Sequence, residues 1–210
     1  VRILAGAKFR NGGQVCVAPT RFLIQERVFE KFLDGFVKAA ESVTVGDGLS
    51  DGTTMGPLAN ARRVEAMEAL TADAIMRGAR IATGGKRIGN LGNFFQPTVL
   101  TDVSKDARVL NEEPFGPIAI VSAFSDYGSA IAEANRLPYG LAAYAYTTSA
   151  KTSADLARDI ESGMLSINHH GLALPELPFG GTKESGYGSE GGSEAMEAFF
   201  NTKLVTEAIN

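Results

Sequence analysis

Short apolar runs alternate with amphipathic stretches along most of this chain, and this alternation is the feature that most constrains its fold. Residues 20–25 form an apolar run with β-branched side chains, and residues 27–42 repeat apolar side chains at three- and four-residue steps. This pattern predicts a strand followed by a helix. It recurs later as strand, helix, strand, helix and strand over residues 118–124, 128–136, 141–147, 149–160 and 164–167. Such a rhythm is typical of an α/β fold, a mostly parallel sheet flanked by helices.

The segments between these elements are also readable. Asn60 is a suitable cap for a helix that ends at Gly78, and residues 80–83 and 97–100 are predicted strands. Residues 168–192 are rich in glycine and show little periodicity, so we expect a long connection that walls an active site. The chain then shows a short helix over 193–200 and an extended segment over 202–208.

Composition bounds the class of protein. The 210 residues suffice for one substantial core, so we expect one domain, and 44% hydrophobic with 21% charged residues is ordinary for a globular protein. No apolar run reaches the roughly 18 residues of a membrane span, and a net charge of −4 gives no reason to expect nucleic acid as a partner.

The single cysteine excludes an intrachain disulfide and fits a reducing, cytoplasmic location. The first residues lack an initiator methionine and the parts of a signal peptide, so the chain reads like a segment of a longer protein.

The cysteine is the first candidate for chemistry. Cys16 follows the bend made by Gly12 and Gly13, residues that adopt backbone angles closed to others and can aim the thiol into a cleft. A thiolate is a strong nucleophile for an electrophilic carbonyl. The competing interpretation is a small buried hydrophobic residue, which is the more usual fate of a lone cysteine.

Three motifs in order bear on this choice. Asn11-x-Gly13-Gln14-x-Cys16, with Arg21 following, precedes Glu112-Glu113-Pro114-Phe115-Gly116-Pro117 and then Pro178-Phe179-Gly180-Gly181-x-Lys183-x-Ser185-Gly186. The order and approximate spacing of these motifs resemble those of the aldehyde dehydrogenase superfamily. The resemblance extends over the whole length of the chain. The resemblance implies a C-terminal catalytic domain over residues 1–200, an oligomerisation strand over 201–210 and a nucleotide-binding domain that precedes the chain.

The resemblance also implies a reaction, the oxidation of an aldehyde to an acid with NAD or NADP, a cofactor held mainly by the preceding domain. Cys16 would be the nucleophile, passing through a hemithioacetal and a thioester, with its own backbone N–H as one oxyanion donor. The family's general base and its asparagine donor lie outside this sequence, so the isolated chain is expected to be inactive.

Other site residues follow from the same motifs. Glu113 and Phe115 match the residues that hold the nicotinamide ribose, whereas Glu112 is assigned to a solvated loop. Phe179 matches an aromatic of the substrate tunnel, His169 is expected at the mouth of that tunnel, and Asn168 is expected to be structural.

The histidine pair allows two other interpretations. His169 and His170 are adjacent, which is not the spacing of helical zinc ligands, and no second cysteine accompanies them, so we expect no metal. Cys16 with a histidine could form a thiol hydrolase pair, although the protease-type sequence around the cysteine is missing.

Arg10 bears on the substrate. It matches a position where the succinate-semialdehyde dehydrogenase group keeps an arginine that holds the far carboxylate of its substrate, and a guanidinium is a bidentate partner for such a group. The loop 167–175 also resembles that group, but Ala173 replaces a serine that some members carry. The alternative for Arg10 is a surface or structural ion pair.

The expected partners are a small-molecule aldehyde and further copies of the chain. In the family the C-terminal tail joins a sheet that spans subunits, which implies a homodimer or homotetramer. A non-catalytic association module of the same superfamily stays open as a second class of function.

Overall fold

The computed structural model describes residues 1–209. Its contacts divide the chain into two compact units, the first covering Val1–Leu137 and the second beginning at Pro138. Each unit is described by itself. The domain boundaries expected from the sequence, 1–200 and 201–210, stay predictions.

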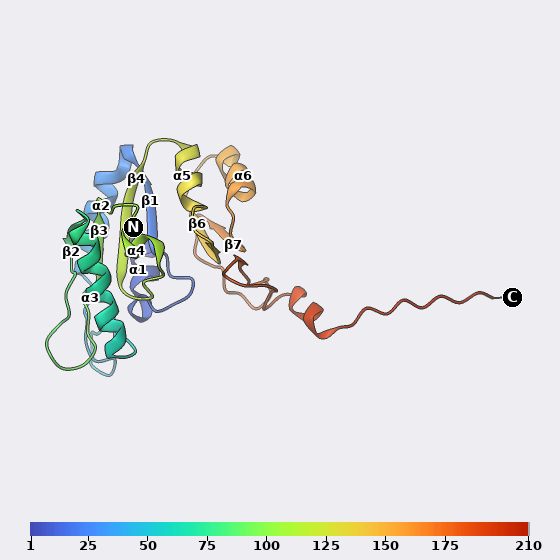
Figure 1. Cartoon of the computed structure of the whole chain (residues 1–210), viewed down its shortest axis with the longest axis horizontal. Coiled ribbons are helices and arrows are strands. Elements are labelled where there is room, and N and C mark those ends of the chain that lie inside the picture. Colours follow the sequence, from blue (N-terminus) through green and yellow to red (C-terminus); the bar gives the residue numbers. More distant parts are fainter. Residues whose placement is uncertain (210) are drawn as a thin grey trace. The chain divides into compact units, whose positions relative to one another are not determined.

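The first unit is built on a four-stranded sheet in the order β1-β4-β3-β2 (Figure 1). The strands are β1 (Arg21–Gln25), β2 (Arg80–Thr83), β3 (Thr98–Thr101) and β4 (Ile118–Phe124). The central strand β4 pairs in parallel with both β1 and β3, and only β2 runs antiparallel to its neighbour. The mostly parallel α/β fold predicted from the sequence is therefore confirmed.

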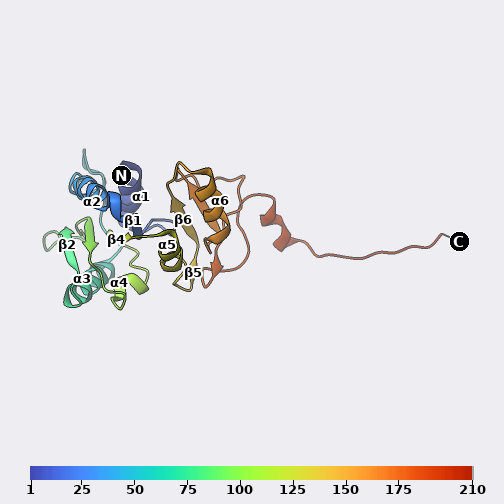
Figure 2. The ribbon, with the colours of Figure 1, turned by 90° about the horizontal axis from the view of Figure 1, so that it is seen from above.

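Helices cover both faces of this sheet, as Figure 2 shows. One face carries α1 (Arg2–Phe9) and α2 (Glu26–Glu41), and the other carries α3 (Ala61–Met76) and α4 (Arg108–Asn111). The unit also contains α5 (Tyr127–Ala134) after β4. The predicted helices at 27–42 and 128–136 correspond to α2 and α5, whereas α1 and α4 were not predicted.

Each strand sends alternate side chains to the two faces, which produces two cores. Ile118 and Ile120 of β4 pack with α3, while Ala119 and Val121 pack with α1 and α2. All four side chains are fully buried. A strand buried on both faces reads as a continuous apolar run, and this explains the sequence of β4.

Helix starts follow the capping rules. The Asn60 side chain accepts a hydrogen bond from the Arg63 N–H at the start of α3, as the sequence predicts. Asp126 caps α5 in the same way, by accepting from the Ser129 N–H.

The second unit has shorter elements. Strands β6 (Ala142–Ala145) and β7 (Met164–Ile167) pair in parallel and are connected by α6 (Ala150–Asp159). The two-residue strands β5 (Tyr139–Gly140) and β8 (Thr182–Lys183) pair antiparallel. The helix predicted at 193–200 is a 3₁₀ helix, η2 (Glu194–Phe199), and residues 201–209 form neither helix nor strand. Over residues 1–209, none of the helices combines the length and the apolar character needed to span a membrane.

Candidate active site

The loop that carries Cys16 leaves α1 through a left-handed turn. The 3₁₀ segment η1 (Arg10–Gly13) contains Asn11, Gly12 and Gly13 at φ values of 52°, 63° and 72°. Only glycine takes this conformation without cost, and asparagine tolerates it better than other residues. The predicted glycine bend is thus confirmed.

Side chains close this turn. The Asn11 amide donates to the Gln14 carbonyl at 3.0 Å, and the Gln14 amide donates back to the Asn11 carbonyl at 2.9 Å. The Gln14 side-chain oxygen also accepts from the Ala59 N–H at 2.8 Å, which ties the loop to the chain entering α3. Two polar residues of the sequence motif therefore hold the backbone that leads to the thiol.

Cys16 itself is exposed. The interpretation of this cysteine as a small buried hydrophobic residue is therefore wrong. An exposed thiol after a braced turn can meet a substrate from solvent.

The nucleophile loop packs directly on the second motif. A Cβ placed on Gly13 would lie 2.1 Å from the Gly116 carbonyl oxygen, and one placed on Gly116 would lie 2.2 Å from the Met67 sulfur. Real Cβ atoms do not approach neighbours this closely. The Gly13 position therefore requires glycine, because its neighbour is backbone, whereas at Gly116 the Met67 side chain would have to shift. The Gly13 contact places the turn at residues 112–117, which we call the ribose turn, against the loop of Cys16.

The two acidic residues of the ribose turn differ. Glu112 is paired with Arg108 through two hydrogen bonds of 2.7 and 3.0 Å, and these bonds lower the pKa of its carboxyl. Glu113 is exposed and forms no hydrogen bond or ion pair with any other described residue. Its carboxylate can accept hydrogen bonds from ribose hydroxyls, and the neighbouring Phe115 ring is 37% exposed and can pack on a sugar. Glu112 is thus paired within the chain, and the cofactor role of Glu113 and Phe115 stays a prediction.

Sequence reasoning missed Lys8, which lies on α1 beside this region. Its side chain is 1% exposed, and its ammonium group donates a long hydrogen bond of 3.4 Å to the Thr20 hydroxyl. Burial lowers the pKa of Lys8 to about 7, against an opposing influence from the Glu113 carboxylate. A lysine on a nine-residue stretch without clear periodicity gave no reason to expect burial.

Arg10 lies at the edge of a cavity of about 430 Å³ between α1 and α2. Arg2, Phe9, Val43 and Thr54 are among the other lining residues, and Cys16 is not one of them. The Arg10 guanidinium makes no ion pair with another described residue, so the alternative of an internal ion pair is not observed in residues 1–209. Arg10 and Cys16 therefore share a loop but not this cavity.

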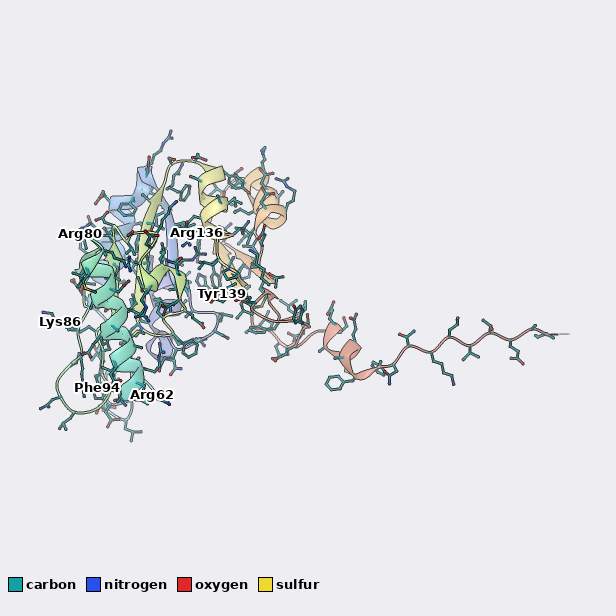
Figure 3. The ribbon with its side chains drawn as sticks, viewed as in Figure 1. Arg62, Arg80, Lys86, Phe94, Arg136 and Tyr139 are labelled. Carbon is teal, nitrogen blue, oxygen red and sulfur yellow. The ribbon has the colours of Figure 1, made fainter. Side chains whose placement is uncertain are left out.

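Arg21, which follows the cysteine in the first motif, has a structural task. Its guanidinium donates to the Glu133 and Ala134 carbonyls at 2.8 and 2.9 Å and to the Glu133 carboxylate at 3.0 Å. It thereby supplies donors to the last carbonyls of α5. Arg136, labelled in Figure 3, extends this network to Asn111 of α4 at 2.7 Å.

The second unit holds the remaining candidates. Phe179 is half-buried, and its backbone exchanges two hydrogen bonds with Glu190, at 2.6 and 2.7 Å. His169 is exposed, and its Nδ1 atom accepts from the Gly171 N–H at 3.0 Å. Asn168 bonds both the N–H and the carbonyl of Thr147, at 2.9 and 2.8 Å, which gives it the expected structural role.

The two histidines do not share an environment. The His170 ring stacks on Tyr144 with centroids 4.1 Å apart, and burial lowers its pKa. Within residues 1–209, no three histidine, cysteine or acidic side chains come together as metal ligands would.

Taken together, unit one is an α/β domain that presents a single exposed thiol on a loop packed against a turn with an exposed carboxylate and an exposed aromatic ring. Comparison with known proteins agrees with this class. The model of the aldehyde dehydrogenase family matches residues 1–205. The chain is 46% identical over 205 residues to 4-(hydroxymethyl)benzenesulfonate dehydrogenase TsaD1 of Comamonas testosteroni, covering 98% of this chain and 42% of the relative.

Solved structures agree as well. The succinate-semialdehyde dehydrogenase of Burkholderia pseudomallei superposes with a TM-score of 0.89 at 40% identity, over 92% of this chain and 41% of that one. Betaine aldehyde dehydrogenase of Staphylococcus aureus, in complex with NAD+, superposes with a TM-score of 0.89 at 32% identity, over 94% and 41%. The chain belongs to the aldehyde dehydrogenase family. It spans about two fifths of the length of the curated relatives that it matches.

The buried lysine gives a pH-dependent prediction. Between pH 7 and 10.5 the unfolded chain binds more protons than the folded one, because Lys8 is neutral when buried and charged when exposed. Replacing Lys8→Met should stabilise the 210-residue chain most at pH 6.5, and this gain should shrink on going to pH 9.5 by at most about 1.4 kcal/mol per unit. Urea unfolding at pH 6.5 and at pH 9.5 measures this gain in the free energy of unfolding. Lys31→Met, at an exposed position, is the control, and a gain independent of pH would contradict the burial of a charge-bearing group.

Proposed function

We propose that this chain is the catalytic domain of an NAD(P)-dependent aldehyde dehydrogenase, with Cys16 as the nucleophile. The observation that carries the proposal is the packing of Gly13 on Gly116, which joins an exposed thiol to a turn whose free carboxylate and ring suit a ribose. Membership of the aldehyde dehydrogenase family supports the same reaction.

In the proposed mechanism the Cys16 sulfur adds to the aldehyde carbon, so that a C–S bond forms and the carbonyl oxygen becomes an oxyanion. The Cys16 backbone N–H is a donor for that oxyanion. The oxidised nicotinamide, when bound, accepts the hydride that leaves the carbon. Cys16 then holds a thioester, and attack by water breaks the C–S bond, releasing the acid and restoring the thiol. A base that activates this water is expected from the part of the enzyme outside this chain.

Glu113 and Phe115 are the residues proposed to hold the nicotinamide ribose. The carboxylate of Glu113 has no competing hydrogen bond within residues 1–209, and this supports the assignment. The rest of NAD or NADP would be bound by a nucleotide-binding domain outside this chain. The NAD+ complex of the staphylococcal relative supports a nicotinamide cofactor of one of these two kinds.

For the substrate we propose an aldehyde that carries an anion, with succinate semialdehyde as the leading example. Arg10 supports this because its guanidinium forms no ion pair within residues 1–209 and because it lies six residues before Cys16 on the same loop. The names of two relatives point in the same direction, since one is a dehydrogenase of a semialdehyde with a carboxylate and the other of an aromatic compound with a sulfonate. Both anions suit a bidentate guanidinium. Phe179 and His169 are proposed to complete the wall of the substrate tunnel.

We further propose a cytoplasmic homodimer or homotetramer. The single cysteine fits a reducing compartment. Several large apolar side chains near the C-terminus are exposed, namely Phe199, Phe200, Leu204, Val205 and Ile209. Their exposure supports a role for residues 201–210 as a strand that pairs with another subunit. The same feature favours the second candidate, a non-catalytic association module, which predicts subunit assembly without binding of a nicotinamide cofactor.

One prediction concerns the nucleophile. In the full-length enzyme that carries this chain, Cys16→Ala should lower kcat by at least about 10³-fold, because the variant lacks the sulfur that forms the covalent adduct. Cofactor reduction followed at 340 nm with saturating aldehyde measures it. Unchanged cofactor affinity in the variant is the control for folding, and oxidation clearly above background would contradict the assignment.

Another prediction concerns recognition of the anionic group of the substrate by Arg10. Arg10→Ala should raise KM for succinate semialdehyde by about 10-fold or more, the loss expected for a hydrogen bond to a charged group. KM for butanal, an uncharged aldehyde of equal length, should change less than about twofold. Steady-state kinetics on the two substrates give the comparison, and equal effects on both would remove the case for an anion clamp.

A further inference from the structure

The side chain of Arg63 connects α3 to the ribose turn. Its Nη2 atom donates to the Pro114 carbonyl and lies 3.4 Å from the Phe115 carbonyl. The two contacts reach across 51 and 52 positions of the chain. Arg63 is the third residue of a capped helix, so its backbone is fixed by the Asn60 side chain. A rigid helix therefore holds two consecutive carbonyls of the turn.

The ends of the ribose turn are held by backbone hydrogen bonds of Glu112 and Pro117, but its middle residues are not. Phe115 adopts φ 43°, in the left-handed region that bulky residues avoid at a cost of about 1–3 kcal/mol. Pro114 and Pro117 have no N–H to donate. No backbone–backbone hydrogen bond joins residues 113–116 to the rest of the described chain. The strained conformation must be maintained from outside, and the Arg63 guanidinium is placed to do so.

The effect of this contact extends to the nucleophile loop. Met67 lies one turn after Arg63 on α3 and packs on Gly116, and the Gly116 carbonyl packs on Gly13. The order of contact is thus helix α3, ribose turn and the loop of Cys16. A shift of the turn on α3 would change both the position of Glu113 and its separation from the thiol.

We propose that Arg63 is a positioning residue of the cofactor site: by binding the Pro114 and Phe115 carbonyls it holds the Glu113 carboxylate and the Phe115 ring in their ribose-binding arrangement. The inference rests on the proposed function of these two residues. Arg63 touches neither substrate nor cofactor and acts through the turn. Arg62 precedes it on the same helix and is labelled in Figure 3. Its exposed side chain forms no hydrogen bond or ion pair within residues 1–209, so Arg62 is a matched control.

The first arm of the test is kinetic and uses the full-length enzyme. Arg63→Ala should raise KM for the nicotinamide cofactor about 10-fold, while Arg62→Ala should change it less than twofold. Arg63→Lys should lie between them, because one ammonium cannot match a guanidinium across two carbonyls. General loss of structure would lower kcat per mole of protein and leave KM of the remaining enzyme unchanged, so the split between the two constants separates positioning from folding.

The second arm needs no activity and uses the 210-residue chain. Chymotrypsin cleavage at the Phe115–Gly116 bond, followed by mass spectrometry, reports loosening of the turn. Cleavage there should be about 10-fold faster in Arg63→Ala than in the wild type and unchanged in Arg62→Ala. If Arg63→Ala fails to fold, Arg63→Lys carries the same comparison.

The outcomes distinguish a failure of the positioning role of Arg63 from a failure of the proposed cofactor role of Glu113. A raised cofactor KM together with faster cleavage supports the inference. Faster cleavage with an unchanged KM would overturn it along with the cofactor role of Glu113. Equal values for the Arg63 and Arg62 variants in both arms would overturn the positioning role alone. A raised KM without faster cleavage would contradict the claim that Arg63 acts on the cofactor site by holding the ribose turn.

Discussion

The close approach of two glycines is the constraint on which the site depends. A Cβ on Gly13 would lie 2.1 Å from the Gly116 carbonyl, so neither the cysteine loop nor the ribose turn can move toward the other or accept a side chain between them. The sheet makes this approach possible: β4 begins directly after the turn and β1 begins shortly after Cys16, and the two strands are parallel neighbours. Packing of the fold thus determines the separation of the proposed nucleophile and cofactor.

Charges around this contact are distributed unevenly. Glu112 is neutralised by Arg108 on the outer side of the turn, whereas Glu113 has only the distant influence of the buried Lys8. Burial makes the charged form of Lys8 costly, and this lowers the pKa of Lys8 to about 7. The Arg63 guanidinium donates to two carbonyls of the same turn. Arg63 from α3 and Arg108 from α4 therefore bind groups of the turn, and the Glu113 carboxylate is left without a hydrogen bond among residues 1–209.

Much of this was predictable because it is local. Apolar runs and helical periodicity located the sheet strands of the first unit and its longer helices, and a glycine bend before a lone cysteine predicted the turn. The resemblance to the family singled out Glu113 as a ribose ligand, and that role stays a prediction. What could not be predicted depends on contacts between distant segments: the burial of Lys8, and the bond of Arg63 to a turn 51 positions away. The elements α4, β5 and β8 were missed since two to four residues are too few to show a period.

The most direct test of Cys16 as the nucleophile is to detect the acyl group on this residue during turnover. The full-length enzyme would be mixed with succinate semialdehyde and oxidised cofactor, quenched in acid during turnover, and digested with trypsin for mass spectrometry. The account predicts that the peptide of residues 11–21, which contains Cys16, gains the mass of the succinyl group, and that hydroxylamine removes it as expected for a thioester. Turnover with that peptide unmodified, or with the acyl group on another residue, would contradict Cys16 as the nucleophile.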